Sequence, residues 1–153
     1  MAGVKTNQEK LNHTLEVVVG VLHEIDIDDW FIMFGTLLGI VREGSCIQGD
    51  DDIDIMISCD YNRLRAAFES RGFTFTSGFG IKNPDTMLKS EMTLEFASFD
   101  FYLCEVDGGE YYTPWHRVRS RDSLPVVKRK WRSTTLNLPN GHLDKLQLMY
   151  GEQ

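Results

Sequence analysis

Two aspartates separated by one residue are the clearest chemical signal in the sequence. Asp52 and Asp54 alternate with Ile53 and Ile55. On a β-strand this alternation places both carboxylates on one face and both isoleucines on the other. The two Cα atoms then lie about 6.6 Å apart, because a strand rises about 3.3 Å per residue. Carboxylates at this spacing can share one or two hard divalent cations, as in metal-assisted transfer at phosphorus.

The elements around these acids would hold them in place. The apolar run 31–34 predicts a first strand, Gly35-Thr36 a turn, and the residues up to Gly44 a short amphipathic helix. Four acids between positions 50 and 54 then lead directly into the apolar run of a second strand. An Asp-rich segment is commonly a solvated turn, but neighbouring carboxylates repel one another unless cations or donors compensate. We therefore interpret the cluster as a metal site.

A third acid lies in a later strand. In the segment 96–104, three apolar side chains share one face and Asp100 lies on the other. A charged Asp in such a strand is costly to bury unless it has a basic, hydrogen-bonding or metal partner. The competing interpretation is an exposed residue on an edge strand, and Glu95 is the alternative acid. Asp100 is thus expected to have a charged or polar partner.

These residues resemble a known family. Gly35-Thr36 followed by Asp-Ile-Asp-Ile is similar to the signature of the nucleotidyltransferase fold shared with DNA polymerase beta. More specifically, the stretch GTLLGIVREGSCIQGDDDIDI resembles the LicD/fukutin family of phosphocholine and ribitol-phosphate transferases. The pattern of that family reads roughly G-T-L-L-G-x-x-R, a short variable loop, and then P-W-D-x-D-I-D-I.

The resemblance continues along the chain, with one departure. Gln48-Gly49 stands where the family usually has Pro-Trp. Further matches at Pro125, Pro139-Asn140 and Tyr150-Gly151 extend the resemblance over about residues 30–151. It therefore spans nearly the whole chain.

The resemblance implies a fold, a reaction and a metal. The fold is α/β (α+β), of the nucleotidyltransferase type, with a small mixed sheet flanked by helices. The reaction moves a phosphocholine-like or ribitol-phosphate-like group from a CDP-alcohol to a glycan or glycan-like hydroxyl and releases CMP. The family has an acid in a strand like the segment 96–104, and Asp100 matches that acid. The resemblance therefore implies that Asp52, Asp54 and Asp100 bind Mg²⁺, or alternatively Mn²⁺.

Three residues near the turn are expected to hold the donor phosphates. Gly35 permits close approach of the backbone, and Thr36 at a helix N-terminus offers N–H and hydroxyl donors. Arg42 is expected to make a further charged contact with the donor phosphates. The alternative for Arg42 is an exposed arginine at the end of the helix.

Three other functions compete with this interpretation. A true nucleotidyltransferase would attack the α-phosphorus of an NTP and release pyrophosphate. A glycosyltransferase would use its D-x-D to bind a metal and a nucleotide-sugar, but the Gly35-Thr36 turn upstream argues against it. A non-catalytic binding module could keep the same fold, although the three retained acids argue against that class.

Positive charge is concentrated in one segment of an acidic chain. The net charge of −7 argues against nucleic acid as a partner, because basic residues carry affinity for a phosphate backbone. Between Arg117 and Arg132, seven basic residues accompany one acid, a local charge of +6. We expect this segment to contact an anionic donor or acceptor, and the alternative is a solvated hairpin face. The candidate contacts are Arg117, Arg119, Lys128 and Arg129.

Length and composition are typical of one soluble domain. The 153 residues are enough for a single domain with its own core, predicted over 1–153. The sequence shows neither a signal peptide nor an apolar run of membrane-spanning length, so a cytoplasmic protein is expected. The three cysteines are scattered, which favours reduced and mostly buried thiols. The pattern does not predict the oligomeric state.

Local patterns also predict the remaining elements. A capping box at Thr6 begins a helix that ends near Asp26, and Asp60 is expected to cap a helix over 61–70. Strands are expected at 73–76 and 87–96, besides the strand that carries Asp100. A hairpin is expected across Gly108-Gly109, and Asn140 is expected to cap a terminal helix.

Overall fold

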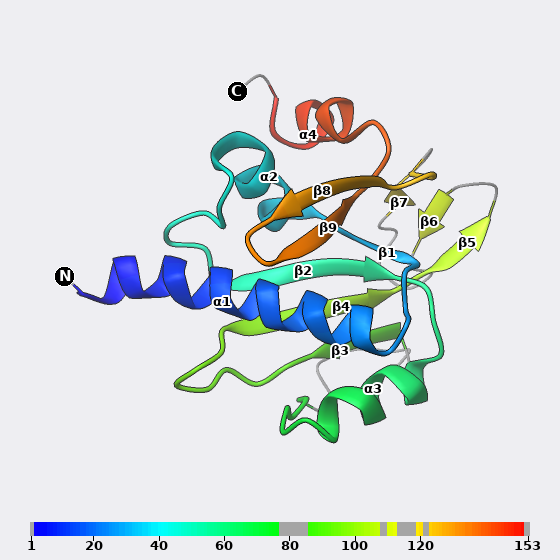
Figure 1. The fold of residues 1–153 in the computed structure, drawn as a ribbon. Coiled ribbons are helices and arrows are strands. Elements are labelled where there is room, and N and C mark those ends of the chain that lie inside the picture. Colours follow the sequence, from blue (N-terminus) through cyan, green and yellow to red (C-terminus); the bar gives the residue numbers. More distant parts are fainter. Residues whose placement is uncertain (1, 77–85, 108–109, 113–118, 121–122, 152–153) are drawn as a thin grey trace.

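A mixed four-stranded sheet lies at the centre of the computed structural model, which describes residues 2–76, 86–107, 110–112, 119–120 and 123–151 (Figure 1). Its strands are, in spatial order, β1 (Trp30–Ile32), β2 (Asp52–Ile57), β4 (Ser98–Leu103) and β3 (Met87–Lys89). The central pair β2 and β4 is parallel, and β1 and β3 pair antiparallel with them at the two edges. The predicted small mixed sheet is confirmed.

In the described part of the chain, four helices and two smaller sheets surround this mixed sheet. The helices are α1 (Ala2–Glu24), α2 (Phe34–Glu43), α3 (Tyr61–Glu69) and α4 (His142–Tyr150). One small sheet contains β5 (Glu105–Asp107), β6 (Glu110–Tyr112) and β7 (Arg119–Ser120), and the other contains β8 (Val127–Trp131) and β9 (Thr134–Leu138). Among the described residues, none of these helices combines the length and apolar character that crossing a membrane requires.

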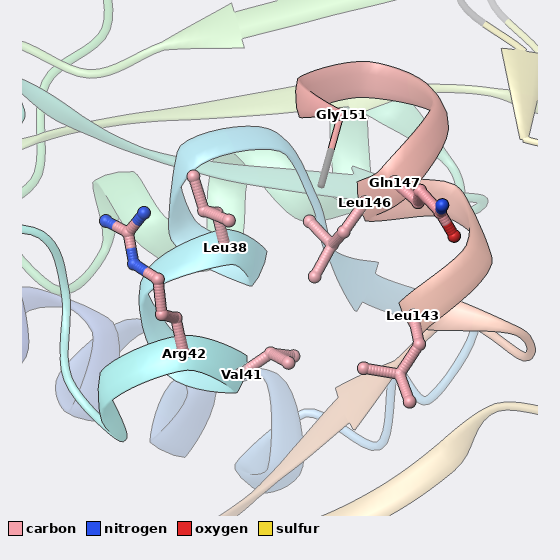
Figure 2. Close-up of a pocket in the computed structure, with 7 residues that line it drawn as sticks. All are labelled: Leu38, Val41, Arg42, Leu143, Leu146, Gln147 and Gly151. Carbon is pink, nitrogen blue, oxygen red and sulfur yellow. The ribbon is translucent and has the colours of Figure 1, made fainter. Parts of the chain in front are cut away.

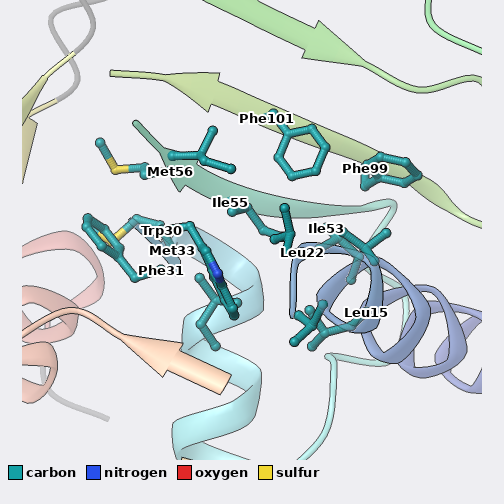
Figure 3. Close-up of a cluster of buried hydrophobic side chains, with 14 of the residues drawn as sticks. Leu15, Leu22, Trp30, Phe31, Met33, Ile53, Ile55, Met56, Phe99 and Phe101 are labelled. Atoms are coloured by element: carbon teal, nitrogen blue, oxygen red, sulfur yellow. The ribbon is translucent and has the colours of Figure 1, made fainter. Parts of the chain in front are cut away.

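The core on one face of the sheet explains why β2 and β4 alternate. Ile53 and Ile55 of β2 are fully buried beside Phe99 and Phe101 of β4, their partners in register. Figure 3 shows these four side chains together with leucines of α1. Phe68 of α3 adds aromatic packing, with its ring centroid 5.6 Å from Phe99 and 5.1 Å from Phe101. Burial of this apolar face fixes the strand register. The acids that alternate with the apolar residues therefore lie on the opposite face of the sheet.

Four local predictions are confirmed. Asp60 caps α3, since its Oδ2 accepts the N–H of Arg63 at 2.8 Å. The strand that carries Asp100 is β4, over Ser98–Leu103. The hairpin is formed by β5 and β6, although Gly108-Gly109 and Pro114 lie outside the described residues. The cysteines are free, with Cys46 and Cys104 buried.

Two helix starts differ from the prediction. α1 begins at Ala2 and runs through Gly3 and Thr6, so the helix starts upstream of the predicted capping box. Thr6 is therefore not its N-cap. α4 begins after Gly141, which takes a left-handed conformation with φ of +67°, so Asn140 does not cap it. The backbone N–H of Asn140 instead donates to the carbonyl of Ser123 at 2.9 Å.

The predicted strands are too long in three places. β1 ends at Ile32, and Phe34 already begins α2 with φ of +54°. β3 ends at Lys89 because the chain turns back toward β4, with the Thr93 hydroxyl accepting the N–H of Phe96 at 2.9 Å. The expected strand at 73–76 is reduced to one bridge between Phe75 and Ser90.

Candidate metal centre

Three carboxylates meet on the face of the sheet opposite the apolar core. Asp54 and Asp100 are direct partners across the parallel pair β2 and β4, and Asp52 lies two residues earlier on the same face of β2. One oxygen from each carboxylate lies within 4.8 Å of the others. Asp54 is 9% exposed and Asp100 is 4% exposed. Two distant parts of the sequence thus place three oxygen ligands around one point.

The electrostatics of this cluster favour a cation. Burial, and then the charges of Asp52 and Asp100, raise the pKa of Asp54 to about 8. Burial and the charge of Asp52 also raise the pKa of Asp100. Both shifts arise because buried negative charges lie close together without enough compensation. A divalent cation would supply that compensation, and carboxylate oxygens are the ligands that Mg²⁺ and Mn²⁺ prefer. The residues therefore fit such an ion.

Two neighbours of the acids were not predicted from the sequence. Lys89 of β3 donates from Nζ to Asp100 Oδ1 at 3.3 Å, and its Nζ lies 3.7 Å from Asp52 Oδ2. The hydroxyl of Tyr102 donates to Asp54 Oδ1 at 3.2 Å. Burial and the charge of Asp54 raise the pKa of Tyr102, so its hydroxyl keeps the proton that it donates. These contacts orient the carboxylates within the cluster.

The first turn of α2, which contains Gly35 and Thr36, is tied directly to the acids. The N–H of Asp54 donates to Thr36 Oγ1 at 3.0 Å, and Thr36 is buried. This bond fixes the start of α2 against β2. Gly35 lies so close to Asp50 that an added Cβ would be 2.7 Å from Asp50 Oδ2. The first N–H groups of a helix have no intrahelical acceptor, so this end of α2 can bind an anion.

A cavity of about 510 Å³ opens beside this turn. It is bounded by the start of α2, the loop before β2, and the end of α4. Its lining residues are Phe34, Gly35, Leu38, Ile47, Gln48, Gly49, Asp50, Asp54 and Tyr150. Gly49, which stands where the family usually has Trp, has φ of +91°, a conformation that L side chains rarely adopt. The cavity therefore connects Asp54 of the acid cluster with Gly35 at the start of α2.

Arg42 lies at a second cavity, of about 430 Å³, between α2 and α4. Figure 2 shows Leu143 and Leu146 of α4 facing Leu38 and Val41 of α2. Arg42 also lines this cavity and lies 3.5 Å from Glu43 through Nη2. Because Leu38 lines both cavities, the second one adjoins the first. The structure therefore places Arg42 about one helical turn beyond Leu38, and not among the lining residues of the acid cavity.

The other predicted contacts lie on β7 and β8 or outside the described residues. Lys128 on β8 pairs with Asp28, with Nζ 2.6 Å from Oδ1. Arg129 is on β8, and Arg119 is in β7. Arg117 lies outside the described residues. Glu95, the alternative acid, lies 3.1 Å from the ring nitrogen of His13, with its side chain 65% exposed.

Comparison with models of known protein families identifies the family of this chain. The family model described as "LicD/FKTN/FKRP, nucleotidyltransferase domain" matches residues 28–141. The chain belongs to this family. Comparison with curated proteins gave no match. The LicD-family match includes Gly35-Thr36, the acids and the strand that carries Asp100, and it indicates a nucleotide-related transferase.

Solved structures support the fold of this LicD-family chain. A lincosamide antibiotic adenylyltransferase, LnuA, crystallised with lincomycin, is 9% identical with a TM-score of 0.59, covering 91% of this chain and 84% of that one. ANT(2")-Ia in complex with adenylyl-2"-tobramycin is 15% identical with a TM-score of 0.59, covering 89% and 72%. A protein from Thermotoga maritima titled as a nucleotidyltransferase is 12% identical with a TM-score of 0.51, covering 90% and 82%. At these identities the likeness establishes the nucleotidyltransferase fold.

Some sequence signal for the missed neighbours did exist. Tyr102 follows Asp100 by two residues, so strand alternation places both on one face. Lys89 ends the short apolar run of β3, but its partner depends on which strand β3 joins. Only the paired sheet reveals that contact.

Proposed function

We propose that this LicD-family protein transfers a phospho-alcohol from a CDP-alcohol to the hydroxyl of a glycan or glycan-like acceptor and releases CMP. The activity is proposed to lie in one nucleotidyltransferase-like domain over 1–153. The observation that carries the proposal is the meeting of Asp52, Asp54 and Asp100 on one face of the sheet, beside the turn that starts α2. The family match over residues 28–141 supports a nucleotide-linked donor.

The chain would hold the reacting groups as follows. Asp52, Asp54 and Asp100 would bind Mg²⁺ or Mn²⁺, which would offset the negative charge that develops on the donor diphosphate. Tyr102 keeps the Asp54 carboxylate turned toward the cluster through its 3.2 Å hydrogen bond. The 3.0 Å bond from the N–H of Asp54 to Thr36 keeps the start of α2 next to the same carboxylate.

The donor phosphates are proposed to lie at the start of α2. Gly35 has no side chain, so a phosphate could approach the backbone there once the carboxylate of Asp50, which now lies against Gly35, moves aside. The N-terminal N–H groups of α2 would donate to phosphate oxygens in the cavity of about 510 Å³. Arg42, in the adjoining cavity, is proposed to contact a part of the donor beyond the diphosphate. We also propose that Arg117, Arg119, Lys128 and Arg129 contact anionic parts of the donor or acceptor.

A second candidate is a nucleotidyltransferase that attacks the α-phosphorus of an NTP and releases pyrophosphate. It is favoured by two proteins of similar fold, the lincosamide antibiotic adenylyltransferase LnuA and ANT(2")-Ia in complex with adenylyl-2"-tobramycin. Both reactions transfer a group at one phosphorus of a metal-bound diphosphate or triphosphate, so the same three carboxylates could support either. The two differ in which phosphorus is attacked and in the product that leaves.

A ligand screen followed by product analysis tests the proposal. Thermal shifts are measured with CDP-choline, CDP-ribitol, CDP-glycerol, CTP and a UDP-sugar, each with and without Mg²⁺. We expect a CDP-alcohol to raise the melting temperature only with Mg²⁺, and the turnover reaction to release CMP. Pyrophosphate release from CTP would favour the second candidate. If no nucleotide changes the melting temperature with Mg²⁺, both reactions are refuted.

A further inference from the structure

Lys89 belongs to a row of charged residues that crosses three strands. Asp54 of β2 pairs in register with Asp100 of β4, and Asp100 pairs in register with Lys89 of β3. Residues paired in register lie on the same face of a sheet, and adjacent strands lie about 4.8 Å apart. The lysine therefore lies on the acid face of the sheet, next to the metal centre.

The ammonium group of Lys89 contacts two of the three carboxylates. Its Nζ is 3.3 Å from Asp100 Oδ1 and 3.7 Å from Asp52 Oδ2, so the side chain reaches across β4 toward β2. The Lys89 side chain is 25% exposed, and that of Asp100 is 5% exposed. These contacts are therefore largely shielded from water, and a cation here affects the carboxylates strongly.

We infer that Lys89 is a built-in cation of the metal centre, so that the centre holds one divalent ion and one ammonium group in place of two divalent ions. The inference rests on one part of the proposed function, namely that Asp52, Asp54 and Asp100 bind a divalent ion. Lys89 would take the position between Asp52 and Asp100, and the ion would be bound on the side of Asp54.

The charges and the distances support this arrangement. Three carboxylates and one ammonium leave two negative charges, which a single divalent ion neutralises. In two-metal centres the ions lie about 3.5 to 4 Å apart and share carboxylate oxygens. A second ion bound by the same oxygens of Asp52 and Asp100 would therefore compete directly with Nζ of Lys89. Like charges so close together repel strongly, so the second ion is excluded while Lys89 stays in place.

Counting bound ions tests this inference without measuring activity. Metal-free protein is titrated with Mn²⁺, and free Mn²⁺ is measured by electron paramagnetic resonance. Lys89→Met removes the charge and keeps an unbranched side chain, whereas Lys89→Arg keeps the charge. Lys130→Met is the matched control, because it makes the same change at an exposed lysine on β8. Melting curves of all four proteins verify folding.

We expect wild type, Lys89→Arg and Lys130→Met each to bind one Mn²⁺ per chain. Lys89→Met should bind a second ion, or bind its single ion at least threefold more tightly, because the competing charge is gone. Two ions in the wild type, or none, would overturn the inference. The inference would also be overturned if Lys89→Met bound one ion with a dissociation constant less than threefold below that of the wild type. The wild-type count is decisive even if the variant fails to fold. Lack of CMP release with one ion bound would refute the proposed reaction and leave the inference intact.

Discussion

Replacing Asp54 with asparagine should stabilise the metal-free protein at neutral pH. Burial and the charges of Asp52 and Asp100 raise the pKa of Asp54 from 3.8 to about 8. The folded protein therefore holds this proton more tightly than the unfolded chain does. The resulting stability is complete below pH 3.8 and is lost as the pH rises through about 8. At pH 7 the loss has an upper limit of about 4 kcal/mol, at about 1.4 kcal/mol per pH unit above the unfolded value.

Asparagine avoids this loss because it carries no charge, and its Oδ1 can still accept the hydroxyl of Tyr102. In a chelating buffer, the melting temperature of Asp54→Asn should exceed that of the wild type by several degrees at pH 7 to 8. This estimate uses about 2 to 4 °C per kcal/mol for a chain of this size. The difference should disappear near pH 4, where Asp54 is protonated.

Mg²⁺ should reverse the order of stability. Saturating Mg²⁺ should raise the melting temperature of the wild type, since an ion that binds only the folded protein stabilises it by about 2.7 kcal/mol at one hundred times its dissociation constant. It should have little effect on Asp54→Asn. Asp107→Asn is the control, because the same change at an exposed carboxylate on β5 should alter stability by less than about 0.5 kcal/mol.

Two results would refute the reasoning about Asp54. A difference in melting temperature that stays constant between pH 4 and 8 would show that Asp54 titrates normally in the folded protein. An equal Mg²⁺ shift in the wild type and in Asp54→Asn would remove Asp54 from the metal centre.

Two further substitutions test the donor and acceptor contacts. Gly35→Ala should lower kcat/KM for the nucleotide donor by roughly tenfold, about 1.4 kcal/mol, because the new Cβ would lie 2.7 Å from Asp50 Oδ2 and displace that side chain into the phosphate position. Steady-state kinetics with varied donor would measure this effect, and an unchanged kcat/KM would place the donor elsewhere. Arg129→Glu should raise KM for the donor or the acceptor by roughly threefold or more, because it reverses a charge in the basic segment. An unchanged KM would mean that β8 presents a solvated face.

Local pattern was enough to predict the main parts of the metal centre. Alternation of Asp52 and Asp54 with isoleucines predicted one acid face and one buried face, and burial of Ile53 and Ile55 confirms it. The same alternation separated Asp100 from the phenylalanines of its strand. Such predictions succeed because side-chain direction along a strand depends only on a period of two residues. The cap at Asp60 succeeded for a similar reason, since it needs only the next three residues.

Element boundaries were less predictable because they depend on contacts with distant residues. The strand after Met87 ends at Lys89, where the chain must turn back to pair antiparallel with β4. The start of α4 was also missed, because Gly141 takes the left-handed conformation there while Asn140 pairs with Ser123. Neither outcome follows from the local sequence.

The sequence by itself determined which face of each strand carries acid, and the family to which the chain belongs. Tertiary structure decided which charges meet. Pairing β4 with both β2 and β3 brings Lys89 within 3.3 Å of Asp100, and the fold brings Tyr102 to Asp54. These contacts depend on strand order and register, which are set by burial of the phenylalanine and isoleucine face. Cross-strand distances therefore could not be obtained from spacing along the chain.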